Sequence, residues 1–579
     1  MSRCLPGLLA LAVAFASGHV LAAADLVLVN GKIFTADRNN PQAQAIAIEG
    51  GKIVAVGTDA QARALADPQT QVIDLHGKRV TPGLIDTHSH AIFGGMQLSG
   101  ADMGGEAVPL DEFETRLRAW RDDGRARNGD VLQVLGVSSA YWAQAKALNE
   151  RFGQGEWAST PIVFIGEDYH TAWANPAMLK RAGIDKALLA TLSKQEKDTI
   201  GTFEDGQPSG FLVDAGWDRV ASVLPKADAA TLLKGAQAAV QFNNSLGITA
   251  WMDPAANSMP GEALFDIKPT DQTVGVLPAY KALAEQGGLN AHVAALLVVN
   301  PKSTPADLQT IDNVRKQFAG VPNLTLPGIK VFADGVLEYP AQSAALLKPY
   351  HNTHKPGELL IDPQHFGELV SAADQRGWLV HVHAIGDRAV RESLNGIEQA
   401  RKAGNSGIHH SITHLQLVNL HDFARFKPLD VIASMQLLWA AGDDYTVDMV
   451  KPYVDASAFR YQYPAHSLQK NGATIAGASD WPVSSPSPWL AIAQASTRKG
   501  AQGVLNADER LDRQTMLYAY TANAAKALGL EQQIGSLSPG KQADFVILDR
   551  DVLAVNDQQL GETQVLATYF GGQQVYAPH

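Results

Sequence analysis

Short apolar runs alternate with helical stretches through the centre of this chain. The runs predict strands at residues 247–252, 292–299, 328–332, 378–383, 408–414, 431–435 and 473–478. Helical patterns, such as residues 387–403, fall between them. Alternation of this kind is typical of a parallel sheet, and with about eight strands a closed (β/α)8 TIM-like barrel is the most economical fold. In such barrels the chemistry lies at the carboxyl ends of the strands.

Near both ends of the chain the sequence pattern is different, and it predicts short strands separated by Asn-Gly and Gly-Gly turns. These strands fall in residues 25–35, 45–57, 540–549 and 565–576. Because the same texture occurs only at the two ends, we infer that they form one small β domain.

The predicted domain boundaries follow from these textures. A β-sandwich domain combines residues 25–82 with residues 521–579, the second part beginning with a helix. The barrel occupies residues 83–520. The stretch at about 95–240 does not fit one strand–helix unit, so we predict an inserted α/β segment there.

Residues 1–24 have the pattern of a secretory signal peptide. Arg3 supplies a positive charge, residues 5–16 are apolar, and residues 20–24 are rich in small side chains. The apolar stretch is too short to cross a bilayer. We therefore expect a periplasmic or secreted protein with no membrane span after cleavage, the alternative being a retained N-terminal anchor.

The composition excludes several kinds of partner and ligand. The chain carries 47 Lys and Arg against 59 Asp and Glu, and this acidic balance disfavours binding of nucleic acid. Its single cysteine, Cys4, lies inside the predicted signal peptide. The mature chain can then form no disulfide, and its metal ligands are limited to His, Asp, Glu and modified Lys. The oligomeric state cannot be read from the sequence.

Two histidines stand at the end of an apolar run, in the sequence Thr-Pro-Gly-Leu-Ile-Asp-Thr-His-Ser-His of residues 81–90. Residues i and i+2 of a strand point to the same side. His88 and His90 can therefore direct two imidazoles at one divalent metal ion. This spacing predicts a metal enzyme.

Further polar residues stand at the ends of the other predicted strands. They are Lys330, His381, His383, His414 and Asp480. Together with the histidine pair they would ring the mouth of the barrel. His381 shares a strand face with His383, and only one of the two needs to be a ligand; we expect His381 to support or pack beside the site.

In these motifs the chain resembles the amidohydrolase superfamily, and within it amidohydrolase family 3, which includes N-substituted formamide deformylases. The resemblance covers nearly all of the mature chain. It rests on the motifs at residues 82–90, 330–335, 383–389, 477–480, 521–525 and 535–544. Their order and completeness make the resemblance specific, although each motif alone is weak.

The resemblance implies a set of metal ligands. His88, His90 and Asp480 would bind the more buried ion, and His383 and His414 would bind a second one. Lys330 occupies the position of the family's bridging lysine, where a carbamate formed with carbon dioxide would link both ions. An unmodified lysine would instead be a cation repelled by them. The sequence leaves open whether the site holds one ion or two, and whether Lys330 is carbamylated.

Imidazole and carboxylate ligands suit Zn²⁺, Mn²⁺ or Fe²⁺, and we expect Zn²⁺ because it is redox-inert. Asp480 is the expected catalytic residue, which takes a proton from water and passes it to the leaving amine. The predicted function is exported, metal-dependent hydrolysis of an amide-type C–N bond (N-acyl, N-formyl or carbamate) in a small molecule. The alternatives are a deaminase or an ester or lactone hydrolase of the same superfamily, and a periplasmic solute-binding protein with a degenerate site.

Two residues are predicted to contact substrate. His170 lies in a segment that resembles a substrate-proximal segment of the family, although Tyr169 stands where the family usually has a small residue. Trp481 follows Asp480 directly, and together with Trp439 it could form an apolar wall.

Overall fold

The computed structural model describes residues 23–260, 262, 264–265, 267–404 and 407–578. The predicted signal peptide lies outside the described residues except for its last two positions. Among the helices of the described part, none combines the length and the apolar character needed to cross a membrane.

Eight parallel strands form the central sheet, with a spatial order that follows the order of the chain. They are β8 (Leu84–Asp86), β15 (Ile248–Asp253), β16 (His292–Val298), β17 (Leu324–Phe332), β18 (Leu379–Ala384), β19 (Ser411–His414), β20 (Ile432–Met435) and β21 (Thr474–Gly477). The last strand returns to the first, where the Thr87 N–H donates to the Gly477 carbonyl at 3.0 Å. The predicted TIM-like barrel fold is confirmed.

The observed strands match the predicted ones within a few residues, and β17 differs most. It begins at Leu324, whereas the apolar pattern predicted residue 328. Pro327 interrupts the apolar pattern, and the register with β16 shifts between Ala294 and Leu296. A bulge of this kind accommodates a proline inside a sheet, which the pattern alone does not reveal.

Alternate residues of the barrel strands face opposite sides. In β15, Ala250 and Met252 belong to the cluster inside the barrel, whereas Trp251 packs in the layer outside it. A strand buried on both faces explains why these runs are apolar throughout. Helix α18 (Ala522–Leu528) adds Leu528 and several alanines to the inner cluster.

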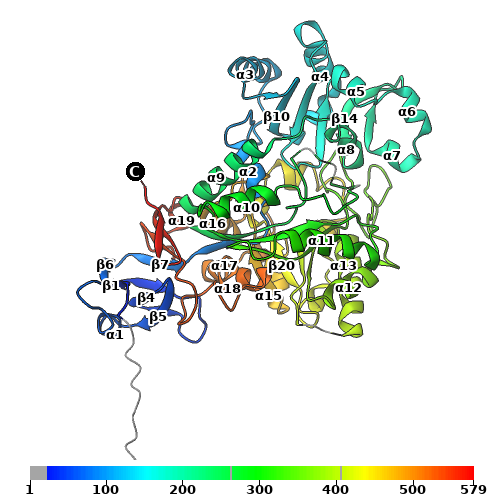
Figure 1. Ribbon diagram of the computed structural model, residues 1–579. Helices are drawn as coiled ribbons and strands as arrows, with labels where there is room; N and C mark the ends of the chain where they lie inside the picture. The colour runs from blue at the N-terminus through cyan, green and yellow to red at the C-terminus, as the bar shows by residue number, and fades with distance from the viewer. Residues whose placement is uncertain (1–22, 261, 263, 266, 405–406, 579) are drawn as a thin grey trace, which may run out of the picture.

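Helices cover the outside of the barrel (Figure 1). The main ones are α9 (Ala229–Ser245), α10 (Leu277–Glu285), α11 (Leu308–Gln317), α12 (Phe366–Asp374), α13 (Asp387–Ala403), α15 (Ala465–Lys470), α16 (Pro488–Thr497) and α17 (Arg513–Ala519).

The two chain ends lie together in a pair of sheets, shown as the blue and red segments at the left of Figure 1. One sheet has the order β5-β4-β1-β6 and the other β26-β25-β24-β7-β2-β3. The strands are β1 (Leu26–Val29), β2 (Lys32–Phe34), β3 (Gln42–Ala43), β4 (Ala45–Glu49), β5 (Lys52–Gly57), β6 (Gln71–Asp74), β7 (Arg79–Pro82), β24 (Phe545–Leu548), β25 (Val565–Phe570) and β26 (Gln573–Tyr576). β7 pairs antiparallel with β24 and continues through Gly83 into the first barrel strand. This small domain therefore fixes the position at which the barrel begins.

The insertion forms a mixed six-stranded sheet with the order β13-β14-β12-β11-β10-β9. Its strands are β9 (Arg127–Asn128), β10 (Val131–Val137), β11 (Ile162–Gly166), β12 (Thr171–Ala174), β13 (Ile200–Thr202) and β14 (Pro208–Val213). Helices α3 (Leu110–Asp123) and α4 (Ala145–Phe152) accompany it at the top of Figure 1. The turn between β11 and β12 carries residues 167–170 to the mouth of the barrel, where they line two cavities.

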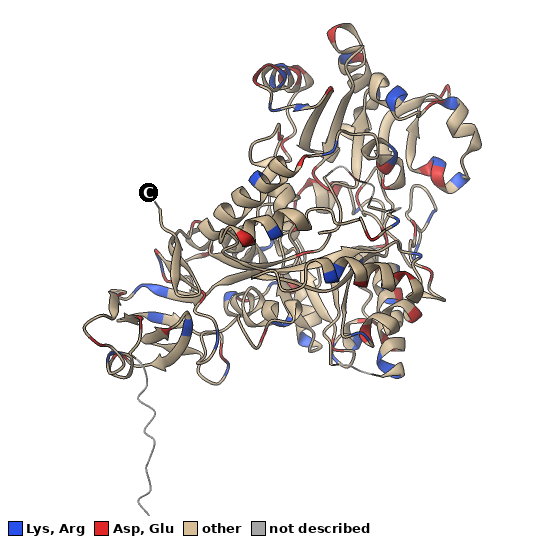
Figure 2. Ribbon diagram, viewed as in Figure 1, with Lys and Arg blue, Asp and Glu red and all other residues tan. Residues whose placement is uncertain are grey.

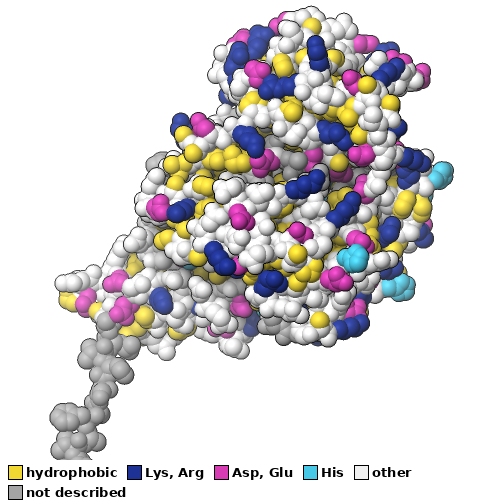
Figure 3. All heavy atoms as spheres, turned by 45° about the vertical axis from the view of Figure 1, so that its right-hand side comes forward, with side chains coloured by type: hydrophobic (Ala, Val, Ile, Leu, Met, Phe, Trp, Pro, Cys, Tyr) yellow, Lys and Arg dark blue, Asp and Glu magenta, His cyan; other side chains and the backbone are white. Residues whose placement is uncertain are grey.

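Charged residues of both signs are spread along the outer helices (Figure 2). On the face shown in Figure 3, basic and acidic side chains are interspersed among hydrophobic ones. This face therefore has no broad basic area of the kind that binds nucleic acid.

Candidate metal centre

One cavity at the carboxyl ends of the barrel strands brings together seven of the residues predicted from the sequence. They are His88, His90, His170, Lys330, His383, His414 and Asp480. The two histidines of the first motif follow β8, and the others come from β17, β18, β19, the segment after β21, and the insertion. The cavity thus draws its polar side chains from strands far apart in the chain.

Asp480 lies at the centre of this group. Its Oδ1 is 3.3 Å from His88 Nε2 and 3.4 Å from His90 Nε2, and its Oδ2 is 3.8 Å from His414 Nδ1. One ligand atom from each of His88, His414 and Asp480 lies within 4.8 Å of the others. This spacing is compatible with a shared metal ion.

The donor atoms fit a metal ion. His414 Nδ1 and Asp480 Oδ1 are buried and have no hydrogen-bond partner among the described residues. Leaving such an atom unpaired costs about 1–3 kcal/mol, which coordination to a cation would recover. Imidazole and carboxylate are the ligands that Zn²⁺, Mn²⁺ and Fe²⁺ accept.

The backbone at two of these residues is strained. His414 has φ = 74° and Asp480 has φ = 60°, a region that residues with a side chain rarely adopt. Each such residue costs on the order of 1–3 kcal/mol and persists only where its surroundings hold it. The Asp480 N–H donates to the His88 carbonyl at 2.7 Å, which holds the carboxylate over the first strand.

A chain of hydrogen bonds positions His88 from behind. His88 Nδ1 lies 2.7 Å from His381 Nε2, and His381 Nδ1 lies 2.6 Å from Ser411 Oγ. Burial, followed by the charge of Lys330 and neighbouring histidines, lowers the pKa of His88 well below its usual value, so its ring is neutral. His88 thus turns its Nε2 toward Asp480 and the cavity, with His381 behind its Nδ1.

Asp86 was not singled out by the sequence analysis, although it lies in the same motif. Ser479 donates to it from its hydroxyl at 2.5 Å and from its backbone N–H at 3.0 Å. The His88 N–H donates to it at 3.1 Å. Asp86 therefore connects the first barrel strand to the segment that carries Asp480.

Lys330 is fully buried beside this group. Burial lowers the pKa of its amine to about 7, so a large fraction of Lys330 is neutral at neutral pH. A neutral amine is the form that adds to carbon dioxide, giving a carbamate and releasing a proton. The environment of Lys330 is thus suited to the predicted modification.

The Nε2 atom of His383 faces protein oxygen atoms and not the other predicted metal ligands. Its Nε2 lies 3.1 Å from the Gly335 carbonyl, to which it donates, and 3.6 Å from Asp334 Oδ1. The His383 and His414 ring centroids are 4.5 Å apart. The structure thus groups His414 with His88 and Asp480, whereas a second ion held by His383 stays a prediction.

His170 faces the same cavity from the insertion. Its Nδ1 lies 2.7 Å from Asp214 Oδ1, and its ring centroid is 5.0 Å from that of His383. Burial lowers the pKa of His170, but the hydrogen bond and charge of Asp214 outweigh this effect and raise it overall. No motif around Asp214 marks it in the sequence, because the contact exists only where β12 and β14 pair within the insertion and bring His170 next to Asp214.

The two tryptophans differ in position. Trp439 lines a larger cavity next to the histidines, and its ring stacks on His414 with 5.7 Å between centroids. The Trp481 ring instead packs against Phe242, 5.4 Å away between centroids, and directly over Gly94 of helix α2 (Ala91–Gln97). Trp481 thus fills the packing beside α2 and lines neither cavity, contrary to the expected substrate contact.

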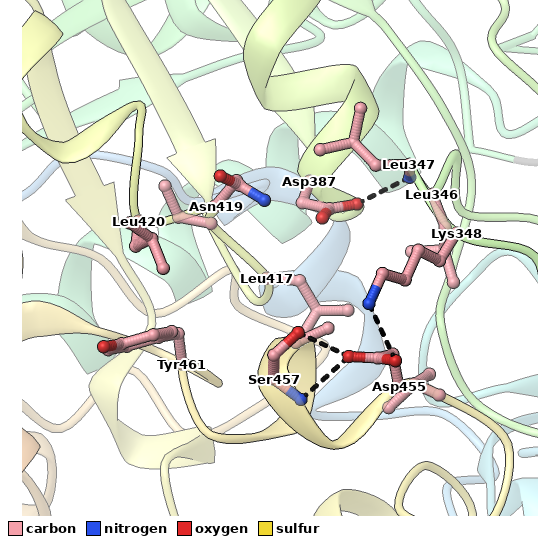
Figure 4. Close-up of a pocket in the computed structure, with 13 residues that line it drawn as sticks. Leu346, Leu347, Lys348, Asp387, Leu417, Asn419, Leu420, Asp455, Ser457 and Tyr461 are labelled. Carbon is pink, nitrogen blue, oxygen red and sulfur yellow. Dashed lines mark hydrogen bonds and ion pairs between the residues drawn. The ribbon is translucent and has the colours of Figure 1, made fainter.

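A further pocket lies beside the loops that follow β18 and β19 (Figure 4). Its polar groups are paired with one another: Lys348 with Asp455 at 2.9 Å, and Asp387 with the Leu347 N–H at 2.8 Å. None of the predicted metal ligands lines it. Asp387, part of the motif at residues 383–389, therefore has a structural contact here.

Comparison with known proteins agrees with this geometry. Residues 71–576 match the amidohydrolase family. The chain belongs to the amidohydrolase family. The predicted family is confirmed, and with it the class of metal-dependent hydrolases.

Among similar proteins, LONG AFTER FAR-RED 3 of Arabidopsis thaliana is 29% identical, over 96% of this chain and 92% of that protein. The N-substituted formamide deformylase of Arthrobacter pascens is 25% identical, over 95% of this chain and 97% of that protein. The crystal structure of a metal-dependent hydrolase from Pyrococcus horikoshii superposes with a TM-score of 0.69 at 25% identity, covering 92% of this chain and 99% of that one.

We predict that His414→Ala lowers the amount of divalent metal bound to the purified protein. The variant removes one member of the three-residue group, so affinity is expected to fall by more than the 10- to 100-fold typical of a supporting residue. The matched control is His421→Ala, because His421 is exposed. Elemental analysis after dialysis measures the effect, and equal metal content in both variants would contradict the assignment.

We predict that Lys330 carries a carbamate at neutral and alkaline pH. Because the pKa of its amine is about 7, protonation below that pH removes the reactive form, and metal retention is expected to fall as the pH is lowered. Added bicarbonate should restore metal binding to protein reconstituted without carbon dioxide. The ¹³C NMR spectrum of protein labelled with ¹³C-bicarbonate measures the carbamate, and a carbamate signal that persists in Lys330→Ala would disprove the assignment.

Proposed function

We propose that the protein hydrolyses an amide-type C–N bond in a small molecule: an N-acyl, N-formyl or carbamate group. The observation that carries this proposal is the grouping of His88, His414 and Asp480, with unpaired donor atoms, at the mouth of an amidohydrolase barrel. The similarity to a formamide deformylase supports hydrolysis of a C–N bond.

We propose Zn²⁺ as the metal, with Mn²⁺ or Fe²⁺ as the alternatives. A divalent ion bound there supplies Lewis acidity, which polarises the scissile carbonyl and makes water acidic enough to react at neutral pH. His88, His90, His414 and Asp480 would hold this ion, and Lys330 as its carbamate would add oxygen ligands.

Asp480 is suited to move the proton. Burial would raise the pKa of Asp480, but the close approach of His90 and the charges of His414 and Lys330 outweigh it and hold this pKa well below its usual value. An ionised carboxylate accepts a proton as the water oxygen bonds to the carbonyl carbon. The same proton then passes from Asp480 to the leaving nitrogen as the C–N bond breaks, which restores the carboxylate.

His170 is suited to stabilise the negative charge that develops on the carbonyl oxygen. Asp214 holds the His170 ring through Nδ1 and favours its protonated form. The remaining Nε2–H can then donate to the oxygen as the tetrahedral intermediate forms. His170 thus acts from the insertion on a reaction centred in the barrel.

We predict that Asp480→Asn lowers kcat by about 10²–10⁴-fold, because an amide cannot accept the proton. The readout is release of amine from a panel of N-formyl compounds, N-acyl-amino acids and carbamates, with lactones and aminopurines included to detect the alternative activities. The control is Asp508→Asn, whose side chain is 81% exposed and pairs with Arg460 at the surface. Near-normal turnover by Asp480→Asn would disprove the proton transfer, and turnover of lactones or ring amines alone would disprove amide hydrolysis.

We also propose that the protein is exported and that residues 1–24 are removed. The support is the sequence pattern of a charged residue, an apolar stretch and a small-residue site. We predict that mass spectrometry of the protein expressed in a bacterial host finds a mature N-terminus near Ala24 or Asp25 in the periplasmic fraction. An intact N-terminus in the cytoplasmic fraction would contradict export.

A further inference from the structure

The larger cavity beside the metal centre is strongly acidic. It encloses about 230 Å³ and shares His170, His383, His414 and Asp480 with the metal centre. Four further carboxylate side chains line it: Glu167, Asp168, Glu338 and Asp443. None of the described residues that line it is a lysine or an arginine.

These carboxylates converge from separate parts of the chain. Glu167 and Asp168 lie in the turn between β11 and β12, and Glu338 lies in the segment after β17. Asp443 stands at the start of the short helix η6 (Asp444–Asp448). The folding of the insertion over the barrel therefore creates the cluster.

Two of the four have local structural roles. Asp168 accepts from the backbone N–H groups of His170 and Thr171 at 2.9 and 2.8 Å. Asp443 accepts from the Thr446 N–H at 3.1 Å and begins the helix. These bonds explain both residues without a ligand.

The hydrogen bonds of Glu167 and Glu338 come from uncharged groups. Glu167 accepts from the Tyr445 hydroxyl, and Glu338 accepts from the Gln416 side-chain amide at 2.7 Å and from the Leu337 N–H at 3.1 Å. Within the described ranges, neither forms an ion pair with a basic side chain. Both are therefore available to a cation that enters the cavity.

The cluster is electrostatically unfavourable without a cation. Burial, followed by the charges of Asp168 and Glu338, raises the pKa of Glu167 to about 8. A positively charged ligand would offset this repulsion, because it would be attracted electrostatically to each carboxylate.

Two other observations mark this cavity as a ligand site. His414 Nδ1 and Asp480 Oδ1 are unpartnered, their residues are only 3% and 7% exposed, and both residues line the cavity. The rings of Trp439, Tyr445 and Tyr463 line it as well. Aromatic rings with carboxylates are the groups that proteins use to bind organic cations.

We propose that the amide substrate carries an organic cation, such as an alkylammonium group, away from its scissile bond. Glu167 and Glu338 bind this cation and thereby place the amide carbonyl against His414 and Asp480. The substrate class is thus an acylated or formylated molecule that retains a second, charged amine. This inference rests on the proposed function, since it concerns the other end of the same substrate.

The test compares two formamides of equal length, one positively charged and one uncharged. One is N-(4-aminobutyl)formamide, a cation at neutral pH, and the other is N-pentylformamide, in which a methyl group replaces the ammonium. We expect kcat/KM of the metal-loaded protein to be at least about tenfold higher for the cation, equal to about 1.4 kcal/mol. Increasing salt is expected to reduce this ratio.

Variants identify the residues responsible. Glu167→Gln/Glu338→Gln is expected to bring the ratio near one, and Glu338→Lys to bring it below one. Loss of fold cannot produce such a reversal, and thermal melting followed by circular dichroism verifies that each variant is folded. The matched control is Glu150→Gln, which neutralises an exposed carboxylate on α4 and should keep the ratio of the unmodified protein.

Binding separates this inference from the proposed function. Calorimetry measures how tightly each of the two formamides binds when no catalysis occurs. The protein used is Asp480→Asn, or the unmodified protein if the unmodified protein hydrolyses neither formamide. Tighter binding of the cation without hydrolysis would support the inference and disprove the proposed function. The inference would be overturned if the protein hydrolysed or bound both formamides equally well. It would also be overturned if the preference for the cationic formamide were unchanged in Glu167→Gln/Glu338→Gln.

Discussion

The contact between the first and last barrel strands is the constraint on which the site depends. Asp86 accepts from both the hydroxyl and the backbone of Ser479, and the Asp480 N–H donates to the His88 carbonyl. These bonds close the sheet where residues nearly four hundred positions apart meet. The same bonds place the Asp480 carboxylate against the imidazoles of the first strand. The same contacts therefore close the barrel, assemble the candidate metal centre and hold the strained backbone of Asp480 in place.

The other parts of the fold act on this junction from two sides. The sandwich of the chain ends holds β7 against β24, so that β7 leads directly into the first barrel strand. The insertion carries His170 and Glu167 over the open end of the barrel. In the proposed mechanism the barrel would supply the metal ligands and the proton acceptor, and the insertion would supply the His170 imidazolium and negative charge around the substrate. This division is common in such barrels, because loops at the carboxyl end vary while the strands stay fixed.

Strand geometry anticipates where some of the site residues lie. The two-residue spacing of His88 and His90 places both on one face, and the structure brings both to Asp480. The environment of other site residues depends on what packs around them, which strand geometry does not reveal. Trp481 follows a ligand, yet Phe242 and helix α2 cover its ring. His383 lies where the family motif places it, yet its Nε2 donates to the Gly335 carbonyl.

The sequence by itself determined the barrel, and it indicated the similar strand pattern of the two chain ends and the polar residues at the strand ends. Each of these follows from short-range periodicity, which is visible in one stretch of chain at a time. Only the tertiary structure decided the support of His88 by His381, the pairing of His170 with Asp214, and the acidic cavity of Glu167 and Glu338. Those contacts join residues that are far apart in the chain, so their partners are set by how separate strands and segments pack and by nothing local to either residue.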